Sequence, residues 1–237
     1  MFLANDMQET IAFYTDVIGW TAKPMPGGSG YTLFANEQGP MAGTVRMSEP
    51  PRWNGNVFVA DATASAEKVR KLGGKVLSEP AHFPGVGHIA VIADPQGAPI
   101  TFYQPDAPRP ARAQPEAIGE FVWRELVTSD HEAAFAFYRE LFGWTKAREH
   151  DLGAMGKYLV YAHGGTELGG MFTKPKEVPA SFWMYYVRVG DLDAAVARAR
   201  KHDAHLMNGP MHVPGGARIA QLRDPQGAMF ALHEAAR

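Results

Sequence analysis

The stretch Phe137-Tyr138-Arg139-Glu140-Leu141-Phe142-Gly143-Trp144 has a counterpart earlier in the chain, Phe13-Tyr14-Thr15-Asp16-Val17-Ile18-Gly19-Trp20. In both stretches a Phe-Tyr pair lies on the apolar side of a predicted helix, and Gly-Trp follows four residues later. Glycine readily adopts the left-handed conformation that ends many helices, so each stretch predicts a helix that stops at its glycine. Two such helices in one chain indicate an internal duplication.

The duplication extends over most of the sequence. Asp94-Pro95-Gln96-Gly97-Ala98 returns as Asp224-Pro225-Gln226-Gly227-Ala228, and Trp53 returns as Trp183. We therefore predict two domains, at residues 1–104 and 119–237. Residues 105–118 are rich in proline and poor in apolar side chains, which is typical of a semi-rigid linker.

Each copy reads as two βαβββ units in tandem. In the second copy, residues 121–127 alternate as a strand, and Ser129 or Asp130 is expected to cap the following helix, with Glu132 completing a capping box after Ser129. Further helices are expected at about 6–18, at 62–72 and at 192–202. Met1 aligns with Glu125, so either the first strand of the first copy is short or the true chain begins upstream of Met1. The predicted fold class is α+β, and each copy should form an open, cup-shaped sheet of mixed strands.

The composition excludes several classes of binding partner and of reactive site. The chain has 237 residues, a formal net charge of −2 and no cysteine. The charge argues against nucleic acid or an anionic membrane as partner, and the lack of thiols excludes disulfides, thiolate metal sites and a cysteine nucleophile. No run approaches the roughly 20 apolar residues that span a bilayer, and the first residues do not resemble a signal peptide. We expect a cytoplasmic protein.

The Phe-Tyr…Gly-Trp helix and the Asp-Pro-Gln-Gly turn, each present twice and in order, resemble the vicinal-oxygen-chelate superfamily. This family includes glyoxalase I, extradiol dioxygenases, and bleomycin- and fosfomycin-resistance proteins. The resemblance implies a tandem two-domain form with a small-molecule site in the cups. The resemblance does not select one reaction, because proteins of this fold catalyse several different ones.

Metal-using members of that family place His, Gln and Glu ligands at four strand positions of a cup. By spacing, the final-strand Glu position holds Thr101 and Ala231 here, and the first-strand position of the second copy holds Trp123. The third position falls near Asn54 and Met184. The second falls within 41–47 and 168–174, which contain neither His nor carboxylate. We therefore predict no metal site of the family type and no cofactor.

A four-residue turn at 94–97 would place His88 opposite Tyr103, and the repeat would place Arg218 opposite His233. Side chains two residues apart share a face of a strand. The candidate ligand-binding residues are then Trp123, Glu125, Met184, Tyr186, Arg218 and His233 in the second cup, and Asn54, Phe58, His88, Thr101 and Tyr103 in the first.

These candidates have simpler interpretations as well. Glu125 and Arg218 could form an ion pair near a rim, and His233 could be an ordinary residue at a strand end. His82 and His212 precede a Pro-Gly sequence in both copies, which favours a structural role in a loop. Trp53 and Trp183 are expected to be packing residues. Glu125 and His233 alone would supply two ligands of a residual metal site.

Three functional hypotheses follow. The first is a metal-independent protein that binds a planar or amphipathic small molecule, with Arg218 favouring an anionic group. The second is a lyase or oxygenase of the same family that uses Glu125 and His233 as acid and base or as residual ligands. In the third, the cups serve as packing surfaces for self-association. The sequence leaves the identity of the ligand and the formation of homodimers open.

Overall fold

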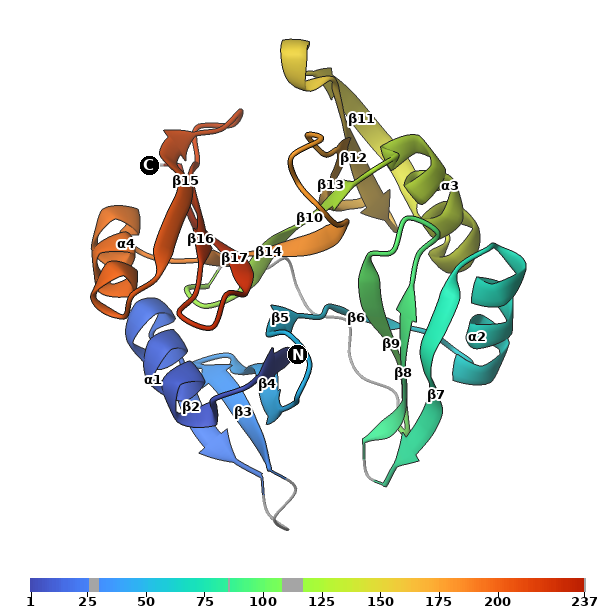
Figure 1. Ribbon diagram of the computed structural model, residues 1–237, viewed down its shortest axis with the longest axis horizontal. Helices are drawn as coiled ribbons and strands as arrows, with labels where there is room; N and C mark the ends of the chain where they lie inside the picture. The colour runs from blue at the N-terminus through green and yellow to red at the C-terminus, as the bar shows by residue number, and fades with distance from the viewer. Residues whose placement is uncertain (26–29, 85, 108–116, 237) are drawn as a thin grey trace. The chain divides into compact units, whose positions relative to one another are not determined.

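A computed structural model describes residues 1–25, 30–84, 86–107 and 117–236 (Figure 1). Most of the predicted linker, residues 108–116, lies outside the described residues. The first copy contains β1 (Phe2–Ala4), α1 (Met7–Ile18), β2 (Thr21–Pro24), β3 (Tyr31–Asn36), β4 (Gly39–Arg46), β5 (Arg52–Trp53), β6 (Asn56–Phe58), α2 (Ala62–Lys71), β7 (Lys75–Phe83), β8 (Gly87–Ala93) and β9 (Pro99–Pro105).

The second copy repeats this order. It contains β10 (Phe121–Thr128), α3 (His131–Phe142), β11 (Thr145–Asp151), a 3-10 turn η1 (Gly153–Met155), β12 (Lys157–His163), β13 (Thr166–Thr173), β14 (Phe182–Arg188), α4 (Leu192–Lys201), β15 (His205–His212), β16 (Arg218–Arg223) and β17 (Met229–Glu234). The four βαβββ units are confirmed, and β1 has three residues where β10 has eight.

The helices begin and end for the reasons that the sequence suggested. Each is N-capped by an aspartate whose carboxylate accepts backbone N–H bonds, and Asp130 rather than Ser129 caps α3. Gly19 and Gly143 end α1 and α3 in the left-handed conformation, at φ 87° and 70°. None of the described helices combines the length and the apolar character needed to cross a bilayer.

The strands form open sheets of mixed direction rather than a closed barrel. Their orders are β2-β3-β4-β1-β5, β6-β9-β8-β7 and β11-β12-β13-β10-β14-β17-β16-β15. The chain divides into two compact units, and each unit combines segments of both sequence copies. Unit 1 consists of Met1–Trp53, Ala113–Trp123 and Met184–Arg237, and unit 2 of Asn54–Arg112 and Arg124–Trp183.

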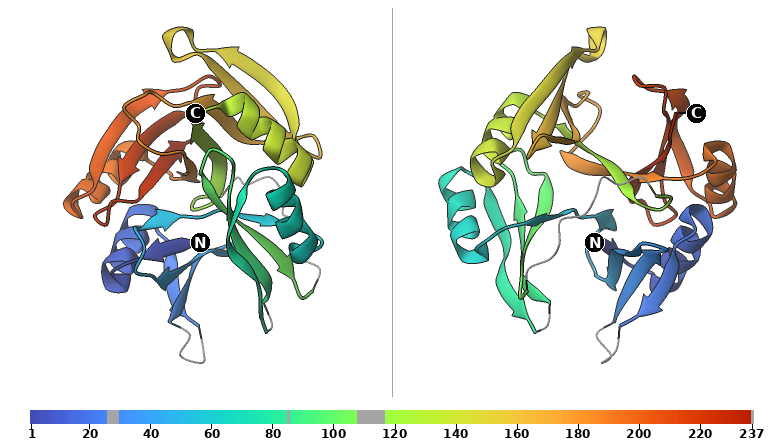
Figure 2. Two further views of the ribbon diagram at one scale, coloured as in Figure 1. Left: turned by 45° about the vertical axis from the view of Figure 1, so that its right-hand side comes forward. Right: turned by 180° about the vertical axis from the view of Figure 1, so that it is seen from behind.

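In unit 1, α1 and α4 lie side by side (Figures 1 and 2). The Arg198 guanidinium on α4 donates to the backbone carbonyls of Asp16 and Val17, at 2.8 and 3.0 Å. These carbonyls lie in the last turn of α1, where helical carbonyls lack partners within the helix. His202 also contacts the Phe13 ring edge-on, with centroids 6.0 Å apart. One helix of each copy thus supports the other.

The two repeated motifs meet in unit 1. The hydroxyl of Tyr14 donates to Asp224 at 2.9 Å and accepts a hydrogen bond from the indole of Trp53 at 2.8 Å. All three side chains are buried. The helix motif of the first copy is therefore bonded to the turn motif of the second, and Trp53 is a core residue as predicted.

Unit 2 repeats this arrangement with the copies exchanged. Tyr138 donates to Asp94 at 3.0 Å, and the Trp183 indole donates to Tyr138 at 3.2 Å. Helices α2 and α3 lie side by side in this unit (Figure 2). The core status predicted for Trp183 is confirmed. The fold signature thus consists of reciprocal hydrogen bonds between the copies, an arrangement that neither motif reveals alone.

Candidate functional site

The strand register differs by one residue from the register we predicted. Ala93 pairs with Pro99, so His88 pairs with Gln104 and Ile89 with Tyr103. The turn is longer than four residues because Asp94 Oδ1 accepts the backbone N–H of Gln96 and of Ala98, at 3.0 and 2.8 Å. A shift of one residue moves a side chain to the other face of the sheet. The predicted pairing of His88 with Tyr103 is therefore wrong, and His88 lies on the opposite face from Thr101.

The second copy shows the same shift. Arg218 pairs with Glu234, and Ile219 pairs with His233. The Arg218 guanidinium contacts Glu234 at 3.1 Å and Asp193, on α4, at 3.0 Å. Arg218 thus lies on the face that α4 covers, so its predicted place beside His233 is wrong. Glu125 and Arg218 are each bonded to other residues, Glu125 to Tyr158.

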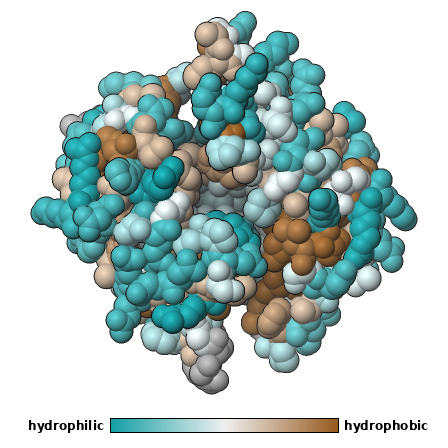
Figure 3. All heavy atoms as spheres, viewed as in Figure 1, coloured by the Kyte–Doolittle hydropathy of each residue, from teal (hydrophilic) through white to brown (hydrophobic). Residues whose placement is uncertain are grey.

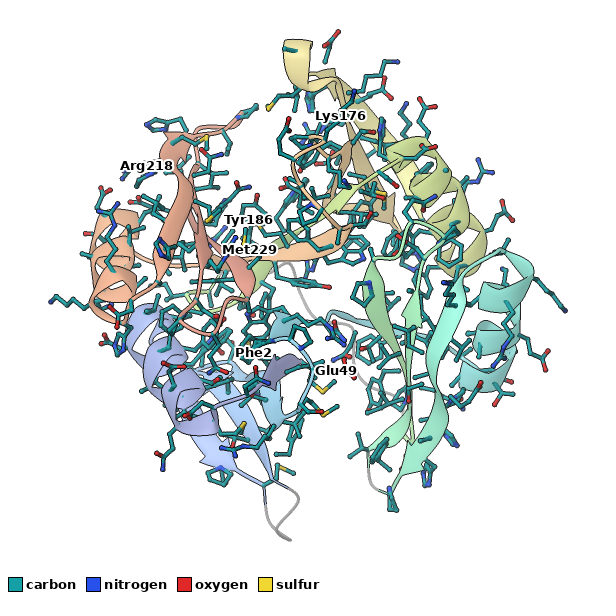
Figure 4. The ribbon with its side chains drawn as sticks, in the orientation of Figure 1. Phe2, Glu49, Lys176, Tyr186, Arg218 and Met229 are labelled. Carbon is teal, nitrogen blue, oxygen red and sulfur yellow. The ribbon has the colours of Figure 1, made fainter. Side chains whose placement is uncertain are left out.

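The face of β14, β16 and β17 that points away from α4 carries several polar groups. We call it the Tyr186 face, and its members are Tyr186, Arg188, Ile219, Gln221, Ala231 and His233. Figure 4 shows Tyr186 on the side of β16 away from α4 and Arg218 on the α4 side. Gln221 Nε2 donates to the Tyr186 hydroxyl at 2.7 Å, which fixes the phenol against the sheet.

His233 is the titratable group of the Tyr186 face. It is registered with Arg188 on the parallel strand β14. Burial, and then the positive charge of Arg188, lower the pKa of His233 below its ordinary value of 6.5. The imidazole is therefore neutral at pH 7. Its Nδ1 atom is buried and has no hydrogen-bond partner among the described residues.

Two other predicted residues of the second cup also belong to unit 1. Met184 is buried and lies two residues before Tyr186, on the same face of β14. Met229 lies two residues before Ala231 on β17 and therefore shares its face of the sheet. Trp123, on β10, is partly exposed. Met184 and Met229 give the Tyr186 face an apolar, polarisable character.

Glu125 belongs to unit 2, on the face of β10, β12 and β13 that also carries Tyr158. The Tyr158 hydroxyl donates to the Glu125 carboxylate at 2.9 Å, and Glu125 is only 7% exposed. The Tyr158 ring occupies the space over Gly170, where a Cβ would meet it at 2.1 Å. This glycine therefore allows the phenol to reach a buried carboxylate, which needs such a donor.

Three candidates of the first cup, Phe58, Thr101 and Tyr103, lie in unit 2, on the face of β6, β8 and β9 away from α2. Parallel pairing aligns Phe58 with Tyr103 and Asn56 with Thr101, and the rings of Phe58 and Tyr103 lie 5.4 Å apart. Thr101 is fully buried, and its hydroxyl has no hydrogen-bond partner among the described residues. Figure 3 shows apolar side chains gathered over this part of unit 2, and Phe58 is 61% exposed.

Asn54 and His88 complete the set of the first cup. Asn54 is 1% exposed, so it belongs to the core of unit 2. His88 shares its face with Gln104, whose amide oxygen accepts the backbone N–H of Ala62 at the start of α2. It therefore stands apart from Phe58, Thr101 and Tyr103.

The side chains at the family's metal-ligand positions do not fit a metal ion. The final-strand position is Ala231, which points away from α4 with Tyr186 and Gln221. The corresponding position in the first copy is Thr101, and the first and third positions hold Trp123, Asn54 and Met184. Zinc, manganese and iron sites need imidazole, carboxylate or thiolate donors, and none of these five side chains supplies one.

The sequence analysis did not identify two polar residues of the Tyr186 face. These are Arg188, which carries its positive charge, and Gln221, which carries its side-chain amide. Arg188 could have been found, since it lies two residues after Tyr186 on one strand. Gln221 could not, because its place on this face depends on the length of the preceding turn. Tyr158, the partner of Glu125, would have required the pairing of β12 with β13.

Comparison with known proteins agrees with the fold and the duplicated architecture. The Glyoxalase/Bleomycin resistance protein/Dioxygenase superfamily model matches residues 118–232, and a glyoxalase-like domain model matches 1–103. The chain belongs to this superfamily.

Two named relatives extend over most of the chain. "Putative glyoxylase CFP32" of Mycobacterium bovis is 31% identical over 237 residues, covering 96% of this chain and 90% of the relative. "Anthracycline biosynthesis protein DnrV" of Streptomyces peucetius is 31% identical over 254 residues, covering 97% of this chain and 89% of the relative.

Solved structures share the fold at lower identity. The Mn(II)-bound glyoxalase from Novosphingobium aromaticivorans has a TM-score of 0.67 at 17% identity, covering 100% of this chain and 80% of that one. The 2,2',3-trihydroxybiphenyl 1,2-dioxygenase from Sphingomonas wittichii strain RW1 has a TM-score of 0.68 at 14% identity, with 100% and 89% covered. At such identities the likeness concerns the fold alone.

Proposed function

We propose that this protein binds a small planar molecule without using a metal ion, and that the Tyr186 face holds it. One observation carries the proposal: where metal-using relatives have a carboxylate ligand, this chain has Ala231, and the groups around it are a phenol, an amide, an imidazole and a guanidinium. Such groups recognise oxygen atoms on an apolar ligand by hydrogen bonds and charge. The methyl group of Ala231 is also smaller than a glutamate side chain.

Arg188 and His233 define the preferred ligand class. A guanidinium favours a carboxylate or phenolate, and a neutral imidazole can accept or donate one hydrogen bond. The relatives named for anthracycline biosynthesis suggest a polycyclic aromatic skeleton. An aromatic carboxylate combines both properties and is the simplest probe.

The experiment uses the full chain without an affinity tag. Native mass spectrometry of freshly purified protein looks for a carried-over organic ligand, and calorimetry then measures binding of 1-naphthoate and of uncharged 1-naphthalenemethanol. We expect Arg188→Gln to weaken naphthoate binding about tenfold and to spare the alcohol. Arg218→Gln removes the same charge from the opposite face of the sheet and should change neither. Equal effects of the two variants would refute binding at the Tyr186 face.

A second candidate is an enzyme of the same family that uses His233 as a general base. The buried Nδ1 atom without a partner and the lowered pKa favour this role. Glyoxalase and ring-cleaving dioxygenase assays test it with wild-type protein and His233→Gln. Turnover that the variant loses, while naphthoate binding persists, would favour the enzyme over the binding protein.

A further inference from the structure

Two histidines and one aspartate meet at one end of the first copy's second βαβββ unit, on the face opposite Thr101. They are His82 on β7, His88 on β8 and Asp106 just after β9. Their ligand atoms all lie within 4.8 Å of one another. His82 Nε2 is 2.9 Å from Asp106 Oδ1, and the two imidazole rings lie 4.7 Å apart.

The backbone holds this cluster together. His82 and His88 are paired residues of an antiparallel hairpin, so their side chains share a face. The carbonyl of Val86, in the turn of that hairpin, accepts the backbone N–H of Asp106 at 3.2 Å and the hydroxyl of Tyr103 at 2.6 Å. These two bonds attach the end of β9 to the hairpin turn. Figure 1 shows the hairpin turn and the end of β9 at the same end of the sheet.

We propose that His82, His88 and Asp106 form a binding site for a late first-row divalent cation such as Zn²⁺. Two imidazoles and one carboxylate are borderline donors that suit Zn²⁺, Ni²⁺ and Cu²⁺ better than Mg²⁺ or Ca²⁺. A tetrahedral Zn²⁺ with bonds of about 2.0–2.1 Å needs its donors roughly 3.3 Å apart, so small side-chain rotations complete the site. His82 and Asp106 are partly exposed, with 46% and 35% of their side-chain surface accessible, which leaves further positions for water or a ligand.

The second copy supplies an internal comparison. His212 occupies the position of His82, and it pairs with Arg218 as His82 pairs with His88. Ala236 stands where the first copy has Asp106, and a Cβ at Gly216, in the corresponding turn, would lie 3.2 Å from the Ala236 Cβ. The second copy thus has His, Arg and Ala at the three positions where the first copy has His, His and Asp. Arg218 is bonded to Asp193 and Glu234, and a guanidinium is not a metal ligand.

The site does not depend on the proposed function. It differs from the family's metal positions, because His88 and Thr101 lie on opposite faces of the sheet. The sequence favoured a loop role for His82 and a cup position for His88. The structure instead places both on strands at one edge of the hairpin turn.

Calorimetric titration of tag-free, chelator-treated full-length protein with ZnCl₂ tests the site. Wild type should bind one equivalent, and His88→Arg and Asp106→Ala, which copy the second repeat, should each lower the affinity at least tenfold. His212→Ala is the matched control and should bind like wild type. Circular dichroism verifies folding, and His88→Gln replaces His88→Arg if that variant does not fold.

Spectroscopy adds a readout that does not rely on affinity. Titration with CoCl₂ should produce visible absorption bands in wild type and in His212→Ala but not in His88→Arg. The proposal is overturned if wild type shows no saturable single equivalent, if His88→Arg or His88→Gln binds as tightly as wild type, or if His212→Ala removes the site.

Discussion

Tyr14 of the first copy donates a 2.9 Å hydrogen bond to Asp224 of the second, and Tyr138 of the second copy donates a 3.0 Å bond to Asp94 of the first. The two residues that mark each copy in the sequence therefore stabilise a unit made from both copies. Since all four groups are buried or nearly so, each bond satisfies polar atoms that would otherwise be costly to bury.

Removing the Tyr14 hydroxyl should destabilise unit 1. Tyr14→Phe leaves the Trp53 indole and one Asp224 oxygen without their partner, and buried unsatisfied groups cost about 1–3 kcal/mol each. We expect a loss of about 3 kcal/mol in the free energy of urea unfolding. Tyr103→Phe removes a hydroxyl that donates to the partly buried carbonyl of Val86 and should cost about 1 kcal/mol. Equal losses for the two variants would contradict the role of the Tyr14 bond.

Stability should fall as the pH rises through the titration of Asp224. Burial raises the pKa of Asp224 from 3.8 to about 6, so the folded state holds this proton more tightly than the unfolded chain. The stabilising contribution is fully present below pH 4 and is lost as the pH rises through 6. Between pH 5 and 7 the loss is about 1 kcal/mol.

The difference between wild type and Asp224→Asn isolates this effect. His233 has a lowered pKa and acts in the opposite direction, but its contribution cancels when the two proteins are compared at each pH. Urea unfolding at pH 5, 6 and 7 should show the wild type losing stability relative to the variant. A constant difference would mean that Asp224 titrates normally.

The two turn glutamines should differ in importance. Gln226 Oε1 accepts the backbone N–H of Asn5 and Asp6, and its Nε2 donates to the Asp6 carbonyl and the Thr10 hydroxyl, all at 2.7–2.9 Å. Gln96 Oε1 is buried without a partner among the described residues, and Ala134 replaces Thr10 in the corresponding helix.

Gln226→Ala should therefore cost about 2 kcal/mol more than Gln96→Ala. Hydrogen exchange followed by mass spectrometry gives a local readout, since the loss should appear as faster exchange in the first turn of α1. Similar stability losses in the two variants, with no change in α1, would contradict this assignment.

Replacing Thr101 by valine should stabilise unit 2 by about 1 kcal/mol, because the fully buried hydroxyl has no partner among the described residues and its desolvation is uncompensated. Thr128→Val is the matched control, since its hydroxyl is buried in the same way. Thermal unfolding measures both. A destabilised Thr101→Val beside a stabilised Thr128→Val would indicate that Thr101 bonds to a ligand on the face of β6, β8 and β9.

The sequence predicted the helices, their aspartate caps and the four βαβββ units, because these features depend on local spacing and capping chemistry. It did not predict the register, since Asp94 lengthens its turn by one residue through bonds to two amides. The Asp94 turn moved His88 off the face where we expected it. The Asp224 turn, whose carboxylate accepts the backbone N–H of Gln226 and of Ala228, did the same for Arg218. The sequence also did not predict the cluster of His82, His88 and Asp106, because this cluster depends on a contact between the end of β9 and the hairpin turn.

The crosswise bonding of tyrosine and aspartate has a consequence for any chain that carries one copy. Such a chain would contain Tyr14 and Asp94 but neither Asp224 nor Tyr138, so these two hydrogen bonds could form only with a second molecule. Joining the copies in one polypeptide replaces that concentration-dependent encounter with a permanent tether. In this chain the assembly of the two copies is therefore independent of dilution, and the two halves carry different surface chemistry, as the histidine cluster and its arginine counterpart illustrate.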